Sequence, residues 1–312
     1  MRNILKINFA FLLMFAIIFF SNCNNSENKI SETPTSGDIK ASIEESYKLL
    51  FDTEIFTFQT FYKNAKVNAA YKPEGDALDD YFKDSVRFIV INRKLTKDEE
   101  NKLVSKSIIP RTTKIAYDAL AFIVNKNNDD SAFAYEQVKE IFEGKISKWQ
   151  QINKKSKLSD MVVVFDNNKS CNPRYIKEKF ELKNNFPSYC FAVNSNQEVI
   201  NYVEKNKNAL GIISVNWLSD NSDSVTINFL NKIKVVAIGS ESGGKPVKPY
   251  QGYIADGSYP FTREIYMISR ESFAGLGTGF VSFVAGEKGQ RIILKSGLVP
   301  AIMPVRLIEV KR

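Results

Sequence analysis

The stretch MVVVFDNNKSCNPRYIKEKF, residues 161–180, decides how the fold of this chain is interpreted. Three adjacent valines followed by Phe165 are typical of a short buried strand, because β-branched side chains pack well in a sheet that is covered on both faces. The polar residues that come next predict a turn. Pro173 suits the first position of a helix, with Asn172 or Cys171 as its N-cap. The stretch therefore predicts a strand, a polar loop and the start of a helix.

The loop and helix start present hydrogen-bond donors beyond the carboxyl end of the predicted strand. Backbone N–H groups at a helix N-terminus have no partner within the helix, and the helix dipole is positive there. Ser170 and Asn172 add side-chain donors, and Arg174 adds a planar guanidinium that suits a tetrahedral oxyanion. We interpret this loop as an oxyanion-binding site. The alternative is an ordinary capped turn with a surface arginine, since such turns far outnumber anion sites.

Composition indicates a globular chain and excludes several kinds of chemistry. The 312 residues are 44% hydrophobic and 25% charged, and this length allows one large domain or two medium lobes. The net charge of +8 comes from basic residues scattered among acidic ones, which favours a small anion over a nucleic acid as partner. The absence of histidine removes serine–histidine hydrolysis, histidine general-base chemistry and most zinc sites. We therefore expect no catalytic residue, no cofactor and no metal.

The amino end, residues 1–22, has the form of a secretory signal peptide. Arg2 and Lys6 precede an apolar run that is shorter than the roughly 20 residues a membrane-spanning helix needs. The sequence FSNC that ends at Cys23 resembles the lipobox of bacterial lipoproteins, which implies cleavage before Cys23 and attachment of palmitate-type lipid to it. A plain cleaved signal and an uncleaved anchor are the alternatives. Residues 23–37 are polar without an apolar period, and we expect them to form a flexible tether.

Cys171 and Cys190 are the cysteines that remain after Cys23. Disulfides persist outside the cytoplasm, so a bond between these two residues would close a loop over the predicted anion site. Sequence does not give the distance between their Cα atoms. A disulfide and two unpaired thiols therefore both stay open.

Hydrophobic periodicity predicts alternating strands and helices over the first third of the chain. The expected strands are 39–43, 66–71 and 87–91, and the expected helices are 46–62, 75–82 and 95–105. This alternation predicts a mostly parallel sheet with helices on its faces. Because ligands gather beyond the carboxyl ends of such strands, we expect Ser46 and Arg93 to share one crevice.

The rest of the chain continues the same α/β pattern. A long mixed strand, residues 112–124, leaves the first group of elements. The further expected elements are a helix at 133–142, a helix at 197–206, strands at 209–215, 233–238 and 261–268, and helices within 273–298.

Several segments, in order, resemble one family. They are residues 115–125, residues 133–149 with Gln137, Ile141-Phe142, Gly144-Lys145-Ile146 and Trp149, residues 208–213, residues 257–263, and Phe283, Gly289-Gln290 and Gly297-Leu-Val-Pro300. Together they are similar to the phosphate-binding components of bacterial ABC phosphate transporters, within the type II periplasmic binding proteins. The similarity runs from Ile39 to the end of the chain.

The resemblance implies an α/β fold of two lobes, each a mostly parallel sheet flanked by helices, joined by crossing hinge strands. Lobe 1 would comprise residues 38–114 and 256–312, and lobe 2 residues 115–255. The resemblance further implies a lipid-anchored monomer on the periplasmic side of a bacterial membrane. Such a protein holds one dehydrated phosphate, or a similar oxyanion, between its lobes and delivers it to the permease subunits of an ABC transporter.

The resemblance also places the binding residues. Most members carry Gly-Ser-Gly-Thr in the anion loop, where this chain has Lys-Ser-Cys-Asn at 169–172. Ser170 keeps the serine position and Asn172 stands where threonine usually donates. Ser46 corresponds to a first-lobe serine or threonine. Asn92-Arg93 occupies the place of a Ser-Asp pair whose aspartate accepts the proton of hydrogen phosphate, so that acceptor is replaced by a guanidinium. The implied oxyanion ligands are Ser46, Arg93, Ser170, Asn172 and Arg174.

Two other functions stay open at this point. A lipid-anchored phosphoesterase could use the same loop, but it would need a nucleophile or a metal cluster. The grouped carboxylates Glu44-Glu45 and Asp129-Asp130 are more simply a helix start and a loop. A sensing or adhesion lipoprotein without a ligand is the third reading.

Overall fold

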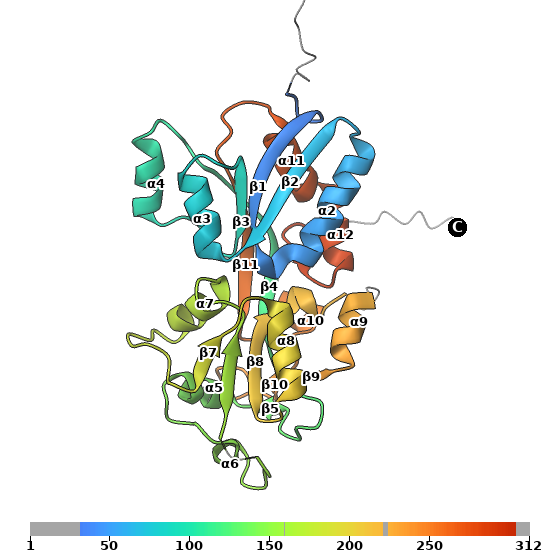
Figure 1. Cartoon of the computed structure of the whole chain (residues 1–312). Helices are drawn as coiled ribbons and strands as arrows, with labels where there is room; N and C mark the ends of the chain where they lie inside the picture. Colours follow the sequence, from blue (N-terminus) through green and yellow to red (C-terminus); the bar gives the residue numbers. More distant parts are fainter. Residues whose placement is uncertain (1–31, 159, 221–223, 304–312) are drawn as a thin grey trace, which may run out of the picture. The chain divides into compact units, whose positions relative to one another are not determined.

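A strand shared by two halves of one sheet organises the molecule. The computed structural model describes residues 32–158, 160–220 and 224–303. Within them one sheet has the strand order β2-β1-β3-β11-β4-β8-β6-β7, with β9 and β12 also paired to β4 (Figure 1). Residues 111–119 of β4 (Arg111–Asn125) pair with β11, whereas residues 120–125 pair with β8 and β9. The expected two-lobed α/β fold with a crossing strand is confirmed.

The first lobe is built on three parallel strands. They are β1 (Gly37–Glu44), β2 (Ala65–Lys72) and β3 (Phe88–Ile91), and β11 (Thr262–Ser269) runs antiparallel beside β3. The other elements are η1 (Glu45–Tyr47), α2 (Lys48–Phe61), α3 (Glu74–Phe82), α4 (Lys97–Val104), α11 (Leu276–Ala285), α12 (Glu287–Lys295) and β12 (Val299–Pro300). Phe280 of α11 joins the helices to the sheet, since its ring centroid lies 5.1 Å from that of Phe58 and 5.5 Å from that of Phe88.

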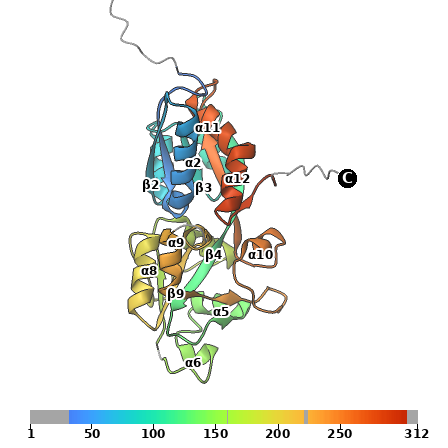
Figure 2. The same cartoon turned by 90° about the vertical axis from the view of Figure 1, so that its right-hand side faces the viewer.

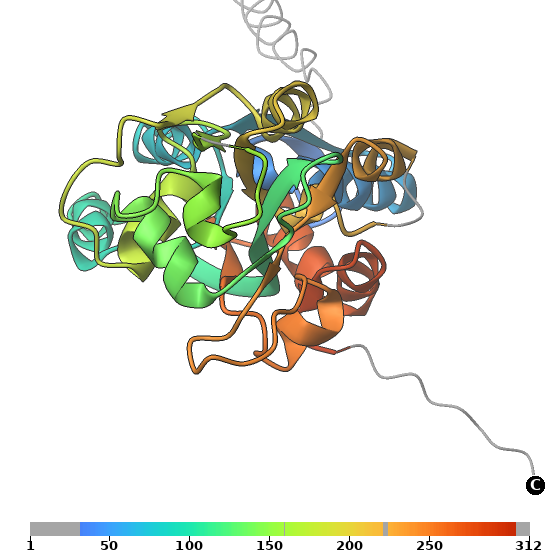
Figure 3. The same ribbon diagram turned by 90° about the horizontal axis from the view of Figure 1, so that it is seen from below.

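The second lobe is built around β6 (Val162–Phe165), which is parallel to β7 (Cys190–Ala192) and β8 (Ala209–Ser214). The other elements are β5 (Ala132–Phe133), α5 (Tyr135–Phe142), α6 (Trp149–Ile152), α7 (Cys171–Lys179), α8 (Asn196–Lys205), η2 (Val215–Trp217), α9 (Ser224–Leu230), β9 (Ile233–Val235), β10 (Ala237–Ile238) and α10 (Gln251–Ala255). Figures 2 and 3 show α8 on one side of β4 and α10 on the other. The sheet is thus covered on both faces, as a run of apolar residues in β6 requires.

Gly211 lets α8 pack closely on β8. A Cβ at this position would lie 2.7 Å from Val199 Cγ1 and Val203 Cγ2 and 2.8 Å from Ile123 Cγ1. We therefore expect Gly211→Ala to lower the free energy of unfolding by about 1–3 kcal/mol, because the helix must move off the sheet. Urea denaturation measures this loss. Gly252→Ala is the matched control, since an added Cβ there meets nothing within 4 Å; equal stability of the two variants would contradict the packing described.

The predicted tether is wrong over its last residues. The Glu32 carboxylate pairs with Arg87, Oε2 to Nη2 at 3.0 Å, and accepts a hydrogen bond from the Leu276 backbone N–H at the start of α11. A carboxylate is favourable at a helix N-terminus, which explains why this polar segment lies on the folded body. The predicted signal peptide, Cys23 and the rest of the tether lie outside the described residues.

The predicted lobe boundaries fall at recognisable places in the chain. The boundary between residues 114 and 115 lies inside β4, and the boundary between residues 255 and 256 lies at the end of α10. Sheet pairing of β4 passes from β11 to β8 between Ala119 and Leu120, and the lobe boundaries stay a prediction.

Candidate functional site

Ser170 begins α7 and fixes the loop that precedes it. Its Oγ accepts a hydrogen bond from the Asn172 backbone N–H at 3.3 Å and donates one to Asp166 Oδ1 at 2.7 Å. The helix therefore starts earlier than predicted, with Ser170 as the N-cap and Pro173 in the third helical position. Serine is a strong N-cap, and proline is tolerated throughout the first turn because those N–H groups have no partner within the helix.

The N-terminus of α7 faces the end of β1. Ser46 Oγ lies 3.8 Å from Cys171 Sγ, and both residues are buried. Asn196 at the start of α8 donates from Nδ2 to Ser46 Oγ at 3.4 Å, and Asn216 donates to the Ser46 carbonyl at 2.9 Å. The residues that follow β1, β6 and β8 thus meet at one point, which we call the crevice. The structure thus brings Ser46 close to the start of α7, which Ser170 caps.

A buried ion pair joins the two strands that cross between the lobes. Arg263 on β11 donates from Nε and Nη2 to Asp118 Oδ2 on β4, at 2.9 and 2.7 Å. Its Nη1 donates to Asn172 Oδ1 at 2.7 Å and lies 3.3 Å from Cys171 Sγ. The arginine side chain is 1% exposed and the aspartate side chain is fully buried. Arg263 is therefore the cation of the crevice and contacts the predicted site residue Asn172.

The sequence interpretation missed Arg263 as a site residue. The available signal was an acidic residue, Asp118, inside an otherwise apolar strand, and an arginine at the start of another buried strand. Charged residues in such strands are rarely fully buried unless they are paired. The antiparallel register of β4 and β11 places these two residues opposite each other.

Two acidic side chains at the strand ends also line the crevice. Glu44 Oε2 accepts a hydrogen bond from the Ser46 backbone N–H at 3.0 Å. Burial, with a contribution from the charge of Asp166, raises the pKa of Glu44 to about 8. Burial also raises the pKa of Asp166 to about 6, although the hydrogen bond from Ser170 and the charge of Arg263 lower it.

Glu45 lies beside this pair. Burial raises its pKa to about 7, against the lowering effect of hydrogen bonds from the Asn196 amide and backbone N–H. The interpretation of Glu44-Glu45 as only a helix start was therefore incomplete. Glu44 does cap η1, but both carboxyl groups lie within the contact between the lobes.

Several buried polar atoms of the crevice have no hydrogen-bond partner within the described part of the chain. They are Glu44 Oε1, the Tyr47 hydroxyl, Asp118 Oδ1, Asn172 Nδ2 and Asn216 Oδ1. A buried polar atom without a partner costs about 1–3 kcal/mol. Because these atoms surround Arg263 and Ser46, the crevice is suited to a small polar molecule that offers both donors and acceptors.

Arg93 and Arg174, two of the predicted oxyanion ligands, both contact Glu74. Arg174 donates from Nε and Nη2 to the two carboxylate oxygens of Glu74, at 2.6 and 2.9 Å, and also to Asn92 Oδ1. Arg93 donates to Glu74 Oε1 at 3.2 Å and forms a bidentate pair with Glu99 at 2.6 and 2.8 Å. Both guanidinium groups are thus paired with carboxylates of the protein, and their role as oxyanion ligands stays a prediction. The oxyanion they hold is the carboxylate of Glu74, whose side chain is 4% exposed.

The disulfide between Cys171 and Cys190 is not formed, and both residues are free thiols. Cys171 Sγ contacts Arg263 beyond the end of β6, whereas Cys190 lies beside Val163, within the length of that strand. Within the described ranges, no group of three or more His, Cys, Asp or Glu residues could hold a metal ion. No helix in the same ranges has the length and apolar character to cross a membrane.

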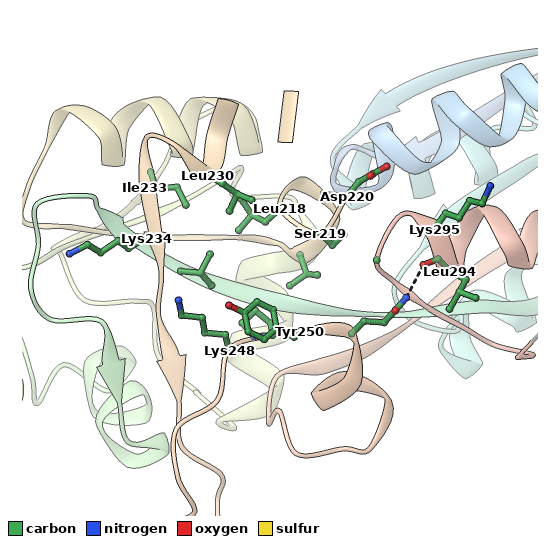
Figure 4. A pocket seen from close by; sticks show the side chains of 15 residues that line it. Leu218, Ser219, Asp220, Leu230, Ile233, Lys234, Lys248, Tyr250, Leu294 and Lys295 are labelled. Carbon is green, nitrogen blue, oxygen red and sulfur yellow. Dashed lines mark hydrogen bonds between the residues drawn. The ribbon is translucent and has the colours of Figure 1, made fainter. Parts of the chain in front are cut away.

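A separate cavity of about 770 Å³ lies between η2, β9, the segment before α10 and the end of α12 (Figure 4). Leu218, Leu230 and Ile233 line it together with Lys234 and Lys248. None of the five predicted oxyanion ligands lines this cavity. The candidate site is therefore the crevice, where the buried polar groups and the N-terminus of α7 converge.

Comparison with known proteins identifies the family of the chain. Residues 28–288 match a family model described as a PBP superfamily domain. The chain is 26% identical over 232 residues to the phosphate-binding protein PstS of Staphylococcus saprophyticus, covering 73% of this chain and 69% of that protein. It is equally identical over 233 residues to PstS of Staphylococcus aureus, covering 73% and 68%.

Solved structures show the same fold. A putative phosphate ABC transporter substrate-binding protein from Clostridium perfringens, with bound phosphate, superposes with a TM-score of 0.72 at 20% identity, covering 85% of this chain and all of that one. An ABC-type phosphate transport receptor from Vibrio cholerae superposes with a TM-score of 0.62 at 20% identity, covering 84% and 99%. The chain belongs to the PBP superfamily, and its fold is that of a type II periplasmic binding protein.

Proposed function

We propose that this protein captures inorganic phosphate, or a closely related tetrahedral oxyanion, in the crevice and delivers it to the permease of an ABC transporter. The names of its relatives support this assignment, and so does the phosphate bound in the C. perfringens structure. The observation that carries it is the meeting of the α7 N-terminus with the buried guanidinium of Arg263 at Asn172. A helix N-terminus and a guanidinium are both suited to an oxyanion.

The proposed ligand groups come from both lobes. Ser46 and Tyr47 supply hydroxyl groups from η1, and Ser170 and Asn172 supply groups from the start of α7. Arg263 supplies the charge, in the role that the sequence assigned to Arg93 and Arg174. In a crevice that excludes water, charge-assisted hydrogen bonds to these groups replace the hydration of the anion. Because the ligand contacts both lobes, its binding favours their closed arrangement.

We further propose that the protein binds its ligand without turnover and acts as a monomer anchored outside the cytoplasm by lipid on Cys23. The relatives are named for binding and transport, and the chain contains no histidine for general-base chemistry. A phosphoesterase would turn over a chromogenic phosphate ester, and this protein is expected to leave such an ester intact.

Titration calorimetry with phosphate, arsenate, sulfate and molybdate tests the proposed binding. We expect phosphate to bind in the micromolar range or tighter, about 8 kcal/mol of binding free energy. Ser170→Ala should weaken binding about tenfold, because the variant loses the cap of α7 and the hydrogen bond that holds Asp166.

Thr96→Ala is the matched control for this substitution. Thr96 caps α4 through the Glu99 backbone N–H, and its side chain makes no contact with the crevice residues. The control should lose helix stability and keep its affinity for phosphate. Absence of measurable binding of all four anions to the unaltered protein would contradict the proposed function.

A further inference from the structure

Glu44 has one carboxylate oxygen that its surroundings satisfy and one that they do not. The residue ends β1 and is fully buried. Oε2 accepts the Ser46 backbone N–H at 3.0 Å, which fixes the orientation of the carboxyl group. Oε1 is buried without a hydrogen-bond partner among the described residues. An ionised carboxylate can only accept hydrogen bonds, whereas a protonated one can donate from Oε1.

Charged and titratable groups from several elements lie around Glu44. Lys72 on β2 is opposite Glu44 in the sheet, but its ammonium group pairs with Asp80 at 2.5 Å. Asp166 follows β6, Cys171 begins α7, and Glu45 and Tyr47 belong to η1. Arg263 on β11 is the cation among these groups. Its Nε and Nη2, however, are already paired with Asp118 on β4.

This arrangement leaves Glu44 and Asp166 without a cation of their own. If both were ionised, a doubly charged anion entering the crevice would meet two like charges in surroundings from which water is excluded. Like charges a few ångströms apart interact much more strongly in such surroundings than in water. The crevice can therefore hold an oxyanion only if some of these carboxyl groups are neutral.

We infer that Glu44 is a neutral carboxylic acid in the liganded protein and donates a hydrogen bond from Oε1 to the bound oxyanion. The inference rests on the proposed function and names the residue that sets the protonation state of the site. When Glu44 is ionised in the free protein, the proton comes from solvent and forms the O–H bond at Oε1. The protonated group then satisfies Oε1 and removes one of the two repelling charges.

The expected pH dependence follows from the same contacts. Burial and the charge of Asp166 raise the pKa of Glu44 to about 8, so the free protein already carries this proton below that pH. Above it the proton must be taken up on binding, so affinity falls as pH rises. For one proton taken up, the dissociation constant increases about tenfold per pH unit.

Titration calorimetry with inorganic phosphate at about pH 6 and about pH 9 tests the inference. Phosphate itself changes its protonation state between these pH values. Comparing the wild-type protein with Glu44→Gln at each pH cancels this effect, because the ligand is the same for both proteins. Glutamine keeps an acceptor for the Ser46 N–H and places an N–H donor at the position of Oε1. The variant should bind phosphate about as tightly as the wild type at the lower pH and about tenfold more tightly at the higher pH.

Glu54→Gln is the matched control. Glu54 is also fully buried, and both of its carboxylate oxygens lack a hydrogen-bond partner in the described structure. Its pKa is raised to about 9 by burial alone, without a contribution from the charged groups of the crevice. This variant should keep the wild-type pH dependence. In the wild type, calorimetry in two buffers of different ionisation enthalpy should show about one proton taken up at the higher pH.

The outcomes separate the inference from the proposed function. Weaker binding by Glu44→Gln than by wild type at the higher pH would mean that Glu44 accepts a proton held by the ligand, and would overturn the inference. Equal pH dependence of the two proteins without proton uptake by the wild type would also overturn it. In both cases phosphate binding itself would stand. No binding of phosphate by the wild type at either pH would contradict the proposed function as well.

Discussion

Arg263→Met is expected to lower the free energy of unfolding by about 3–5 kcal/mol, the cost of leaving a buried charge without its partner. Asp118 is fully buried, and it receives two hydrogen bonds from Arg263 through Oδ2. The variant should also lose phosphate binding, since the guanidinium is the cation of the crevice. Urea denaturation and calorimetry measure the two effects.

The double variant Arg263→Met with Asp118→Leu separates these effects. Replacing both members of a buried ion pair by apolar residues is often nearly neutral for stability. The double variant should therefore recover most of the lost stability and still fail to bind phosphate. If the free energy of unfolding of Arg263→Met were within about 1 kcal/mol of the wild-type value, the ion pair would be more exposed to water than its geometry indicates.

Glu74→Ala is expected to weaken phosphate binding by about 5–150-fold, which corresponds to about 1–3 kcal/mol. Glu74 on α3 receives a bidentate contact from Arg174 on α7, so it ties the two lobes together. Truncating one member of a buried charge pair costs about 2–5 kcal/mol of binding free energy. The loss in Glu74→Ala should be smaller, because water reaches the partner Arg174, whose side chain is 24% exposed. Because the contact crosses between lobes, its loss should favour a more open arrangement.

Equilibrium dialysis and small-angle scattering measure these two effects of Glu74→Ala. Glu178→Ala is the matched control, because Glu178 pairs with the same arginine from within α7 and its side chain is 60% exposed. An exposed pair of this kind contributes only about 0.3–0.5 kcal/mol. Wild-type affinity and an unchanged radius of gyration in Glu74→Ala would contradict the role of this contact in closure.

The fold was predictable because its signals are local. The apolar run of residues 162–165, the polar loop and the helix after it were all recognised from neighbouring residues, and the alternation of β1 to α4 followed from periodicity. The start of α7 was misplaced because Pro173 was assigned to the first helical position, which made Asn172 or Cys171 the expected cap in place of Ser170. Only the hydrogen bonds of Ser170 to Asn172 and Asp166 decide between them.

The site was less predictable because its contacts join residues far apart in sequence. Arg174 and Glu74 are 100 positions apart, so the sequence did not show that a carboxylate of the protein occupies this arginine. Arg263 and Asp118 are 145 positions apart and meet only through the register of two crossing strands. The residues next to Glu44 in sequence predict only a helix start at this position. Its interaction with Asp166 of the second lobe is not visible in those neighbouring residues.

Anomalous diffraction from crystals grown with arsenate would locate the bound ligand, because arsenic marks the position of a tetrahedral oxyanion. We expect one strong peak in the crevice, within hydrogen-bond distance of the α7 N-terminus and Arg263, with ligand oxygens close to Ser46 and Glu44 Oε1. A peak beside Arg93, a peak in the cavity lined by Lys234 and Lys248, or no peak at a saturating arsenate concentration would contradict the proposed oxyanion site.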